Sequence, residues 1–372
     1  MNAHEYEVGL HKSEIDTPAL LIDLDVMEQN LARMSEFFRG VSAVLRPHVK
    51  LHHATPILAH KQIAAGGVGL TCAKLSEAEL LAAAGFTDIL IANQIVGERK
   101  IRRLVNLAAY TEVIVAVDHP DNVRALSAAA TARGVTLRVL VEVNIGHNRC
   151  GVAPFEPALE LSRLVHDSPG LRYLGLMGYD GHLTLKVTPE ERAAQAPETA
   201  RLLAETRAYV EAAGLPVTIV SASGTFTYRY AAQIPGITEI QAGTYLLMDT
   251  AFQEKGVTEF GCALTVLGTV TSRPSYPGAE NLAIIDVGRK AIDTGWALPQ
   301  VKNPAGAFIK SMSQEHGRMD VSGVATPPQL GDRVELSPSD CNCTINLYDR
   351  FYAMRGDIVE AVWDIPGRGA ST

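Results

Sequence analysis

The stretch EVIVAVDHPDNVRALSAAATARGVTLRVLVEVN, residues 112–144, decides the fold class. It begins with an apolar run, continues through a segment with helical character that a glycine closes, and ends in a second apolar run. Apolar runs of this length without polar alternation are typical of strands buried on both faces. The stretch therefore predicts a strand, a helix and a second strand parallel to the first.

The same pattern repeats along most of the chain. Eight apolar runs alternate with helical segments, at residues 18–25, 41–48, 68–73, 88–93, 112–119, 137–144, 171–182 and 216–224. Eight units at this spacing favour a (β/α)8 TIM-type barrel over a doubly wound open sheet, and we expect the barrel to cover residues 16–250. Residues 251–372 have strand-like runs separated by turns, which predicts an antiparallel β domain completed by the N-terminal segment 1–15.

Composition excludes several classes of partner. The 372 residues carry a formal net charge of -8 and contain no basic run, so nucleic acid is not expected as a partner. No apolar stretch approaches the roughly 18 residues that a membrane span requires, and the N-terminus has charges where a signal peptide has an apolar core. Five scattered cysteines, an odd number, suit a reducing cytoplasm.

The segment LRPHVKLHH, residues 45–53, places a lysine shortly after the second apolar run. Functional side chains of barrels lie at the carboxyl ends of the strands, which is where Lys50 falls. A lysine amine in a partly desolvated barrel mouth is available as a nucleophile, because burial disfavours its charged form. His48 precedes Lys50 by two residues and would share its side of an extended strand, although a purely packing role for His48 stays open.

Two turns rich in small residues follow the last apolar runs. They are SASGT, with Ser223, Gly224 and Thr225, and QAGTY, with Gln241, Gly243 and Thr244. Glycine lets backbone N–H groups approach an anion closely, and the hydroxyl groups add donors. Late loops of a barrel are its usual phosphate site, so we expect these turns to bind a phosphate group.

Ten phrases in order resemble the D-threonine aldolase and D-serine dehydratase family, which has the alanine racemase type of fold and depends on pyridoxal 5′-phosphate (PLP). The phrases are TPALLIDLD (17–25), RPHVKLHH (46–53), CAKLSEAELLAAAG (72–85), EVNIGHNRCGV (142–152), MGYDGH (177–182), SASGT (221–225), QAGTYLLMD (241–249), DVGRKAID (286–293), SQEHG (313–317) and CTINLYDRFYAMRGDIVEAVWDIPGRG (343–369). The resemblance implies that Lys50 forms the Schiff base to PLP. It also implies that Arg149 and Tyr179 lie against the cofactor ring or its substituents, and that the enzyme is a homodimer.

The sequence departs from the family at its metal ligands. The family carries a divalent metal on a C-terminal His-x-Asp or His-x-Cys pair, and the matching stretch SPSDCNCTINLYD has Asp340 and Asn342 instead. Oxygen donors suit Mg²⁺ or Mn²⁺, and in an extended segment the two side chains would face one ion together. The alternative, that this member has lost the metal, stays open.

The resemblance implies a lyase that acts on a D-configured β-hydroxy-α-amino acid and cleaves it by a retro-aldol reaction to glycine and an aldehyde. The base that takes the β-hydroxyl proton is expected among His52, His53 and His182. Alternatives are the β-elimination of a D-serine or D-3-hydroxyaspartate dehydratase, an amino-acid racemase, and a non-catalytic PLP-binding protein. With the resemblance set aside, a barrel hydrolase also remains.

Overall fold

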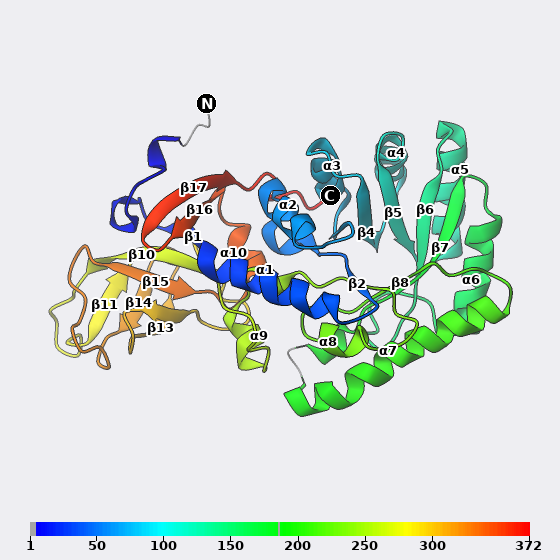
Figure 1. Cartoon of the computed structure of the whole chain (residues 1–372). Coiled ribbons are helices and arrows are strands. Elements are labelled where there is room, and N and C mark those ends of the chain that lie inside the picture. Colours follow the sequence, from blue (N-terminus) through cyan, green and yellow to red (C-terminus); the bar gives the residue numbers. More distant parts are fainter. Residues whose placement is uncertain (1–4, 185–186) are drawn as a thin grey trace. The chain divides into compact units, whose positions relative to one another are not determined.

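The computed structural model describes residues 5–184 and 187–372, and the chain divides into two compact units (Figure 1). The barrel unit comprises residues 34–50, 54–244 and 370–372. The β unit comprises the described part of residues 1–33, together with 51–53 and 245–369. The chain therefore passes between the units several times. The first boundary between the two units falls within helix α1 (Leu24–Arg39).

The barrel unit contains eight strands in the order β2-β9-β8-β7-β6-β5-β4-β3, and every neighbouring pair is parallel. Their bounds are β2 (Val44–Leu45), β3 (Leu70–Cys72), β4 (Asp88–Gln94), β5 (Glu112–Val117), β6 (Leu137–Glu142), β7 (Leu171–Gly178), β8 (Ile219–Ala222) and β9 (Glu239–Ile240). Just beyond β2, His48 pairs with Thr71 of β3, and the Thr71 N–H donates to the Pro47 carbonyl at 2.8 Å. These contacts join the two ends of the sheet, so the predicted (β/α)8 barrel is confirmed.

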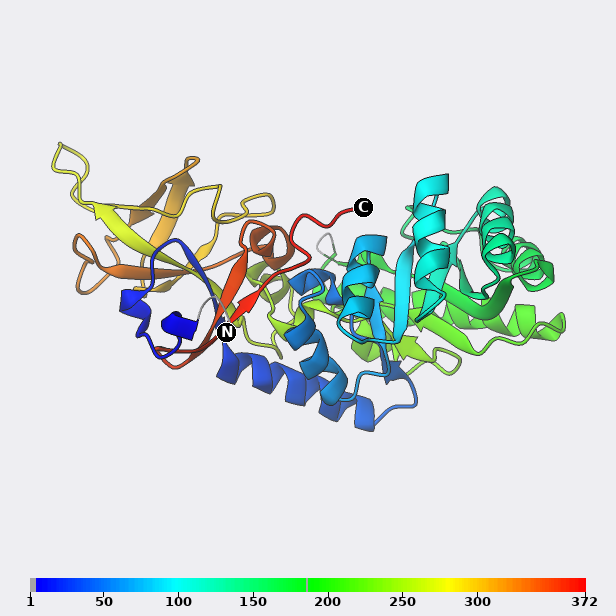
Figure 2. The ribbon, with the colours of Figure 1, turned by 90° about the horizontal axis from the view of Figure 1, so that it is seen from above.

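Helices follow the barrel strands along the chain and lie outside them (Figure 2). Their bounds are α2 (Pro56–Ala64), α3 (Leu75–Ala83), α4 (Glu98–Leu107), α5 (Pro120–Arg133), α6 (Glu156–Asp167), α7 (Pro189–Ala212) and α8 (Tyr228–Ala231). Local sequence explains their ends. Helix α5 starts with a proline and stops at Gly134, which has φ +72°, and α7 begins with a capping box between Thr188 and Glu191.

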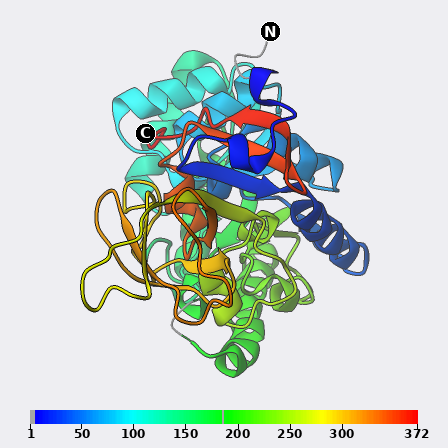
Figure 3. The same cartoon turned by 90° about the vertical axis from the view of Figure 1, so that its left-hand side faces the viewer.

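One expected barrel strand belongs to the other sheet. Strand β1 (Ala19–Asp23) pairs antiparallel with β10 (Leu264–Ser272) and parallel with β16 (Arg350–Arg355), as the blue strand in Figure 3 shows. The eighth barrel strand is β9, which is only two residues long. A strand in the middle of a sheet is buried on both faces, so β1 has the same apolar pattern as a barrel strand and was miscounted as one.

The β unit holds a sheet of nine strands that is mostly antiparallel. Besides β1, β10 and β16 it contains β11 (Leu282–Ile285), β12 (Gln300–Asn303), β13 (Phe308–Met312), β14 (Gly317–Asp320), β15 (Arg333–Ser337) and β17 (Ile358–Asp364). It also includes two short helices, α9 (Thr250–Glu254) and α10 (Cys341–Ile345). The predicted antiparallel sheet is confirmed.

Residues near the N-terminus associate with this sheet. The Gly9 N–H donates to the Val359 carbonyl at 2.9 Å, and the Lys12 N–H donates to the Asp357 carbonyl at 2.8 Å. Strand β1 and the first part of α1 also belong to the β unit, whereas the expected boundaries of 16–250 place them in the barrel. Residues 1–4 of the expected N-terminal segment lie outside the described residues.

Across the described parts of the chain, no helix combines the length and the apolarity needed to cross a membrane.

Candidate active site

Most of the expected site residues follow five barrel strands that are neighbours in the sheet, in the order β6-β7-β8-β9-β2. The carboxyl ends of parallel strands lie at one edge, so the segments after these strands share one end of the barrel. The expected residues there are His48, Lys50, Arg149, Tyr179, His182, Ser223, Gly224, Thr225, Gln241, Gly243 and Thr244. All of them belong to the barrel unit.

Lys50 lies after β2, in a short 3-10 helix (Val49–His52), and is exposed. Its backbone N–H donates to His48 Nδ1 at 3.3 Å. His48 itself is bound to the next strand end, because its N–H donates to the Ala242 carbonyl at 3.1 Å. A Cβ atom at Gly243 would lie 2.2 Å from the His48 carbonyl oxygen, so only glycine allows this approach. The backbone of this segment is therefore fixed to the neighbouring strand end, and the Lys50 side chain is exposed.

Arg149 and Tyr179 meet across the ends of β6 and β7. The guanidinium carbon of Arg149 lies 5.2 Å from the centroid of the Tyr179 ring, within cation–π range. Burial raises the pKa of the Tyr179 hydroxyl to about 12, with a smaller opposing effect of the arginine. The hydroxyl therefore stays protonated at neutral pH and is available as a hydrogen-bond donor.

The turn after β8 is held by buried polar groups. Ser223 adopts a positive φ of 67° and its hydroxyl lies 2.6 Å from that of Thr227. Asp180 is buried; burial raises its pKa, and the hydroxyls of Thr227 and Ser223 oppose that rise. A Cβ atom at Gly224 would lie 3.5 Å from Cε2 of Tyr179, and a turn of small residues at this end of the barrel fits the phosphate of PLP.

Asp180 was not predicted as a site residue, although it lies directly between Tyr179 and Gly181 in GYDGH. His147 was also missed. Its ring lies edge-on to the ring of Tyr179, with the centroids 5.5 Å apart. A repeated Gly-His dipeptide, after β6 and again after β7, was the available signal.

Four expected site residues belong to the β unit instead: His52, His53, Asp340 and Asn342. His52 is fully buried. His53 has a positive φ of 50°, and its Nε2 lies 2.9 Å from the Asn342 carbonyl oxygen. Both histidines are therefore committed to packing or to backbone contacts, in contrast to the strand-end residues.

The expected extended geometry at Asp340 and Asn342 is wrong. Asp340 is the N-cap of α10, and its Oδ1 accepts hydrogen bonds from the N–H groups of Asn342 at 2.8 Å and Cys343 at 3.4 Å. A cap residue followed by a helical turn replaces the strand because the aspartate satisfies the free N–H groups of that turn. Alternation of side chains therefore does not apply to this segment.

This geometry does not fit a metal pair. The Asn342 amide nitrogen donates to Asp340 Oδ1 at 3.1 Å, so the amide presents N–H, and not oxygen, to the carboxylate. A cation needs two oxygens converging on it. Within residues 5–184 and 187–372, no three His, Cys, Asp or Glu side chains are grouped to hold an ion. We therefore derive no catalytic step through a metal.

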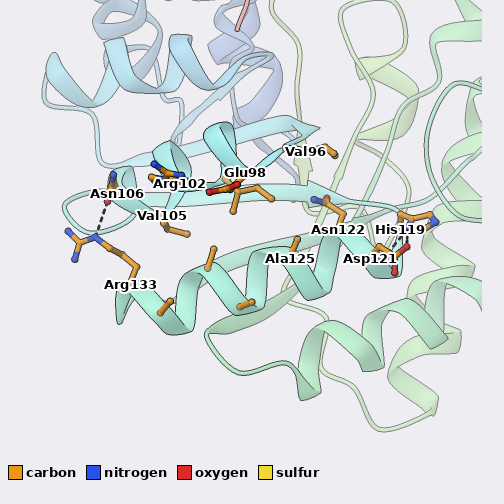
Figure 4. Close-up of a pocket in the computed structure, with 15 residues that line it drawn as sticks. Val96, Glu98, Arg102, Val105, Asn106, His119, Asp121, Asn122, Ala125 and Arg133 are labelled. Carbon is orange, nitrogen blue, oxygen red and sulfur yellow. Dashed lines mark hydrogen bonds and ion pairs between the residues drawn. The ribbon is translucent and has the colours of Figure 1, made fainter.

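A cavity of about 820 Å³ lies between α4 and α5, with Ala125, Ala128, Ala129 and Ala132 along one wall (Figure 4). Its polar lining includes the ion pair between Glu98 and Arg102 and the hydrogen bond from Arg133 to Asn106. None of the strand-end residues described above lines it. The cavity is therefore separate from the candidate active site.

Two family models match the chain. The alanine racemase N-terminal domain matches residues 22–251, and a putative serine dehydratase domain matches residues 263–354. A parallel barrel with a lysine after its first strand, combined with an antiparallel sheet, defines a PLP-dependent enzyme of the alanine racemase type. The chain belongs to the D-threonine aldolase and D-serine dehydratase family within that type.

Relatives match over nearly the whole chain. A D-threonine aldolase of Arthrobacter sp is 34% identical over 96% of this chain and 94% of its own length. A 3-hydroxy-D-aspartate aldolase of Paracoccus denitrificans (strain Pd 1222) is 32% identical over 97% and 94%. A D-threo-3-hydroxyaspartate dehydratase of Delftia sp. (strain HT23) is 31% identical over 94% and 97%.

The fold agrees with these matches. The crystal structure of a D-threonine aldolase from Filomicrobium marinum superposes with a TM-score of 0.93 at 35% identity, over 98% of this chain and 99% of that chain. These four proteins are aldolases and a dehydratase, and this chain is a PLP-dependent lyase.

Proposed function

We propose that this enzyme cleaves a D-configured β-hydroxy-α-amino acid by a retro-aldol reaction to glycine and an aldehyde. The observation that carries the proposal is the set of strand-end residues on five neighbouring barrel strands, in a chain similar to two kinds of D-amino-acid aldolase over nearly its full length. When bound, PLP supplies a sink for the electron pair that is released as the bond between Cα and Cβ breaks.

Residues of the barrel unit would hold the cofactor. Lys50 is the residue for covalent attachment, because its exposed side chain follows β2 at the functional end of the barrel. Arg149 and Tyr179 would lie against the ring. The turn with Ser223, Gly224 and Thr225, and the turn with Gln241, Gly243 and Thr244, would bind the phosphate. Gln241 Nε2 donates to the Ser221 hydroxyl at 2.8 Å, which ties the second turn to β8.

His182 is the base that we assign to the β-hydroxyl proton. The O–H bond breaks as an N–H bond forms on the imidazole, and the electrons left on oxygen form the aldehyde carbonyl as the bond between Cα and Cβ breaks. The other two candidates are less suitable, because His52 is fully buried and His53 is bonded to a backbone carbonyl oxygen. His182 is only partly buried and follows β7 at the functional end of the barrel.

The second candidate function is β-elimination of water to a 2-oxo acid and ammonia. The observation that favours it is the similarity to the Delftia dehydratase, which is nearly as strong as that to the aldolases. The two reactions need different proton transfers: the aldol cleavage starts from the β-hydroxyl proton, whereas the elimination starts at Cα.

One experiment separates these functions. Purified enzyme would be incubated with the D and L forms of threonine, 3-hydroxyaspartate and serine, and the products identified by chromatography. Glycine and an aldehyde from D substrates alone are expected. Ammonia and a 2-oxo acid would establish the dehydratase, and interconversion of the D and L forms would establish a racemase. His166→Ala, an exposed change on α6, is the matched control for histidine variants.

Two further properties are part of this proposal. We propose a cytoplasmic location, which is supported by five cysteines that are all free. We also propose a homodimer, which is supported by the family resemblance. Sedimentation of the PLP-loaded enzyme would report a dimer mass, and a monomer at working concentration would contradict it.

A further inference from the structure

Two Gly-His dipeptides occupy equivalent places at the functional end of the barrel. Gly146-His147 follows β6, and Gly181-His182 follows β7. Strands β6 and β7 are parallel neighbours, with Glu142 opposite Met177 at their ends. The two dipeptides are therefore brought to the same edge of the sheet by the register of these strands.

Each histidine ring lies against the glycine of the other dipeptide. A Cβ atom at Gly146 would lie 2.9 Å from Cε1 of His182 and 3.0 Å from its Nε2. A Cβ atom at Gly181 would lie 2.9 Å from both Cε1 and Nε2 of His147. Real Cβ atoms do not approach ring atoms this closely, so both glycines are needed for the arrangement.

The two imidazole rings stack on one another. Their centroids are 6.5 Å apart and their planes differ by 23°. His147 also meets the ring of Tyr179 edge-on, at 88°. His147 thus contacts both the tyrosine that we assign to the cofactor ring and the histidine that we assign as base.

His182 lacks the hydrogen bond that usually orients a functional histidine. Its Nδ1 is buried, and among the described residues it has no hydrogen-bond partner. Functional imidazoles are ordinarily fixed through the nitrogen that does not react. The orientation of the His182 ring therefore depends on packing, and the ring packs against Gly146 and His147.

We propose that His147 is a positioning residue that holds the His182 ring by stacking, so that Nε2 of His182 faces the substrate hydroxyl. The inference rests on the proposed function in taking His182 as the base. The carboxylate of Asp180 also interacts electrostatically with His182.

The test compares three substitutions at one position. His147→Ala and His147→Gln remove the aromatic face, whereas His147→Phe keeps an aromatic ring without a titrating nitrogen. We expect Ala and Gln to lower kcat about 10- to 100-fold with little change in KM, because a reacting group misplaced by about 1 Å costs up to about 100-fold. The His147→Phe variant should recover at least half of the decrease in log kcat that the Ala variant shows. His166→Ala should leave kcat unchanged.

A spectroscopic readout avoids turnover altogether. In PLP-loaded enzyme without substrate, the NMR signal of the His182 ring C–H should shift in the Ala and Gln variants, because the ring current of the stacked neighbour is lost. It should stay near the wild-type position in Phe. Circular dichroism and the visible absorbance of PLP establish that each variant is folded and loaded.

Three outcomes would overturn the inference: unchanged kcat in Ala, a Phe variant as slow as Ala, or a loss confined to KM. Failure of the proposed function would look different. If His182→Ala retained full kcat, His182 would not be the base, whatever the variants at position 147 showed. An unchanged NMR signal of the His182 ring in His147→Ala would show that the two rings do not stack, independently of the reaction.

Discussion

Arg149 and Tyr179 form a cation–π pair that joins the segments after β6 and β7, with 5.2 Å between guanidinium carbon and ring centroid. Burial of Tyr179 works against ionisation of its hydroxyl, and Arg149 partly offsets that effect. The pair therefore presents a positive charge and a neutral hydroxyl side by side. Such a combination suits a flat cofactor ring with polar substituents.

Replacement of Arg149 by methionine should weaken PLP binding about 5-fold or more, because the contact with the cofactor ring that we propose for this guanidinium would contribute about 1 kcal/mol. The pKa of the Tyr179 hydroxyl should rise further, because the nearby cation is lost. Titration of PLP onto cofactor-free enzyme, followed by visible absorbance, measures the first effect. Arg172→Met on β7, an exposed change, is the control, and equal affinities for PLP in the two variants would refute the assignment.

Lys50 should carry the cofactor covalently. Borohydride reduction of the loaded enzyme followed by peptide mapping should place PLP on Lys50, and Lys50→Ala should lose both the adduct and the visible absorbance. Lys290→Ala is the control, since Lys290 is exposed and paired with Glu315 in the β unit. An adduct on any other lysine would show that the placement is mistaken.

The hydrogen-bonded pair of Asp340 and Asn342 predicts an enzyme that is indifferent to chelation. Dialysis against a chelator should leave kcat unchanged, and elemental analysis should find no stoichiometric ion. The double variant Asp340→His/Asn342→Asp should gain affinity for Mn²⁺ by calorimetry, because an imidazole and a carboxylate are better ligands than the carboxylate and the amide of the wild type. Asp349→His, an exposed change, serves as its control. One ion per chain in the wild type, absent from Asp340→Ala, would establish a metal site after all.

Asp249 should make the enzyme less stable as the pH rises. It caps α9, is fully buried, and has a pKa raised to about 8, mainly by burial. An unfolded aspartate has a pKa of about 3.9, so the folded state retains a proton that the unfolded state releases. This contribution is complete below about pH 4 and is lost as the pH rises through about 8, by up to about 1.4 kcal/mol per pH unit.

Asp249→Asn removes the charge while keeping an oxygen that can accept from the Phe252 N–H, which bonds Asp249 at 3.1 Å. Urea unfolding across this pH range should give a free energy of unfolding that changes less with pH for the variant than for the wild type. Asp121→Asn, an exposed change in the first turn of α5, should leave the wild-type slope intact. Parallel curves for wild type and Asp249→Asn would contradict the assignment.

The barrel was predictable because its strands are buried on both faces and are separated by helices of regular length. The same signal misplaced β1, since a central strand of an antiparallel sheet also lacks polar alternation. Strand β9 was missed because two residues carry no periodicity. The sheet to which a buried strand belongs depends on partners far away in the sequence, which a local pattern does not contain.

The site shows a similar division. Lys50 and the small-residue turns could be placed from their positions after apolar runs. Asp340 could not, because the choice between a strand and a helix cap depends on three N–H donors close in sequence and on the packing around them. His147 is visible in the sequence GHNRCG, but its role depends on contacts with the segment that follows β7. Only the register of β6 and β7 brings the two segments together.

The position of β1 has a consequence for the nascent chain during translation. Strand β1 leaves the ribosome early, but its partners start only at Leu264 and Arg350. At ordinary rates of synthesis β1 waits roughly 10 to 50 seconds for the first of them, while the barrel residues are completed. An apolar strand with free edges is a template for wrong pairing during that interval. Biogenesis of this enzyme should therefore depend on chaperones that shield the nascent N-terminus until translation nears its end.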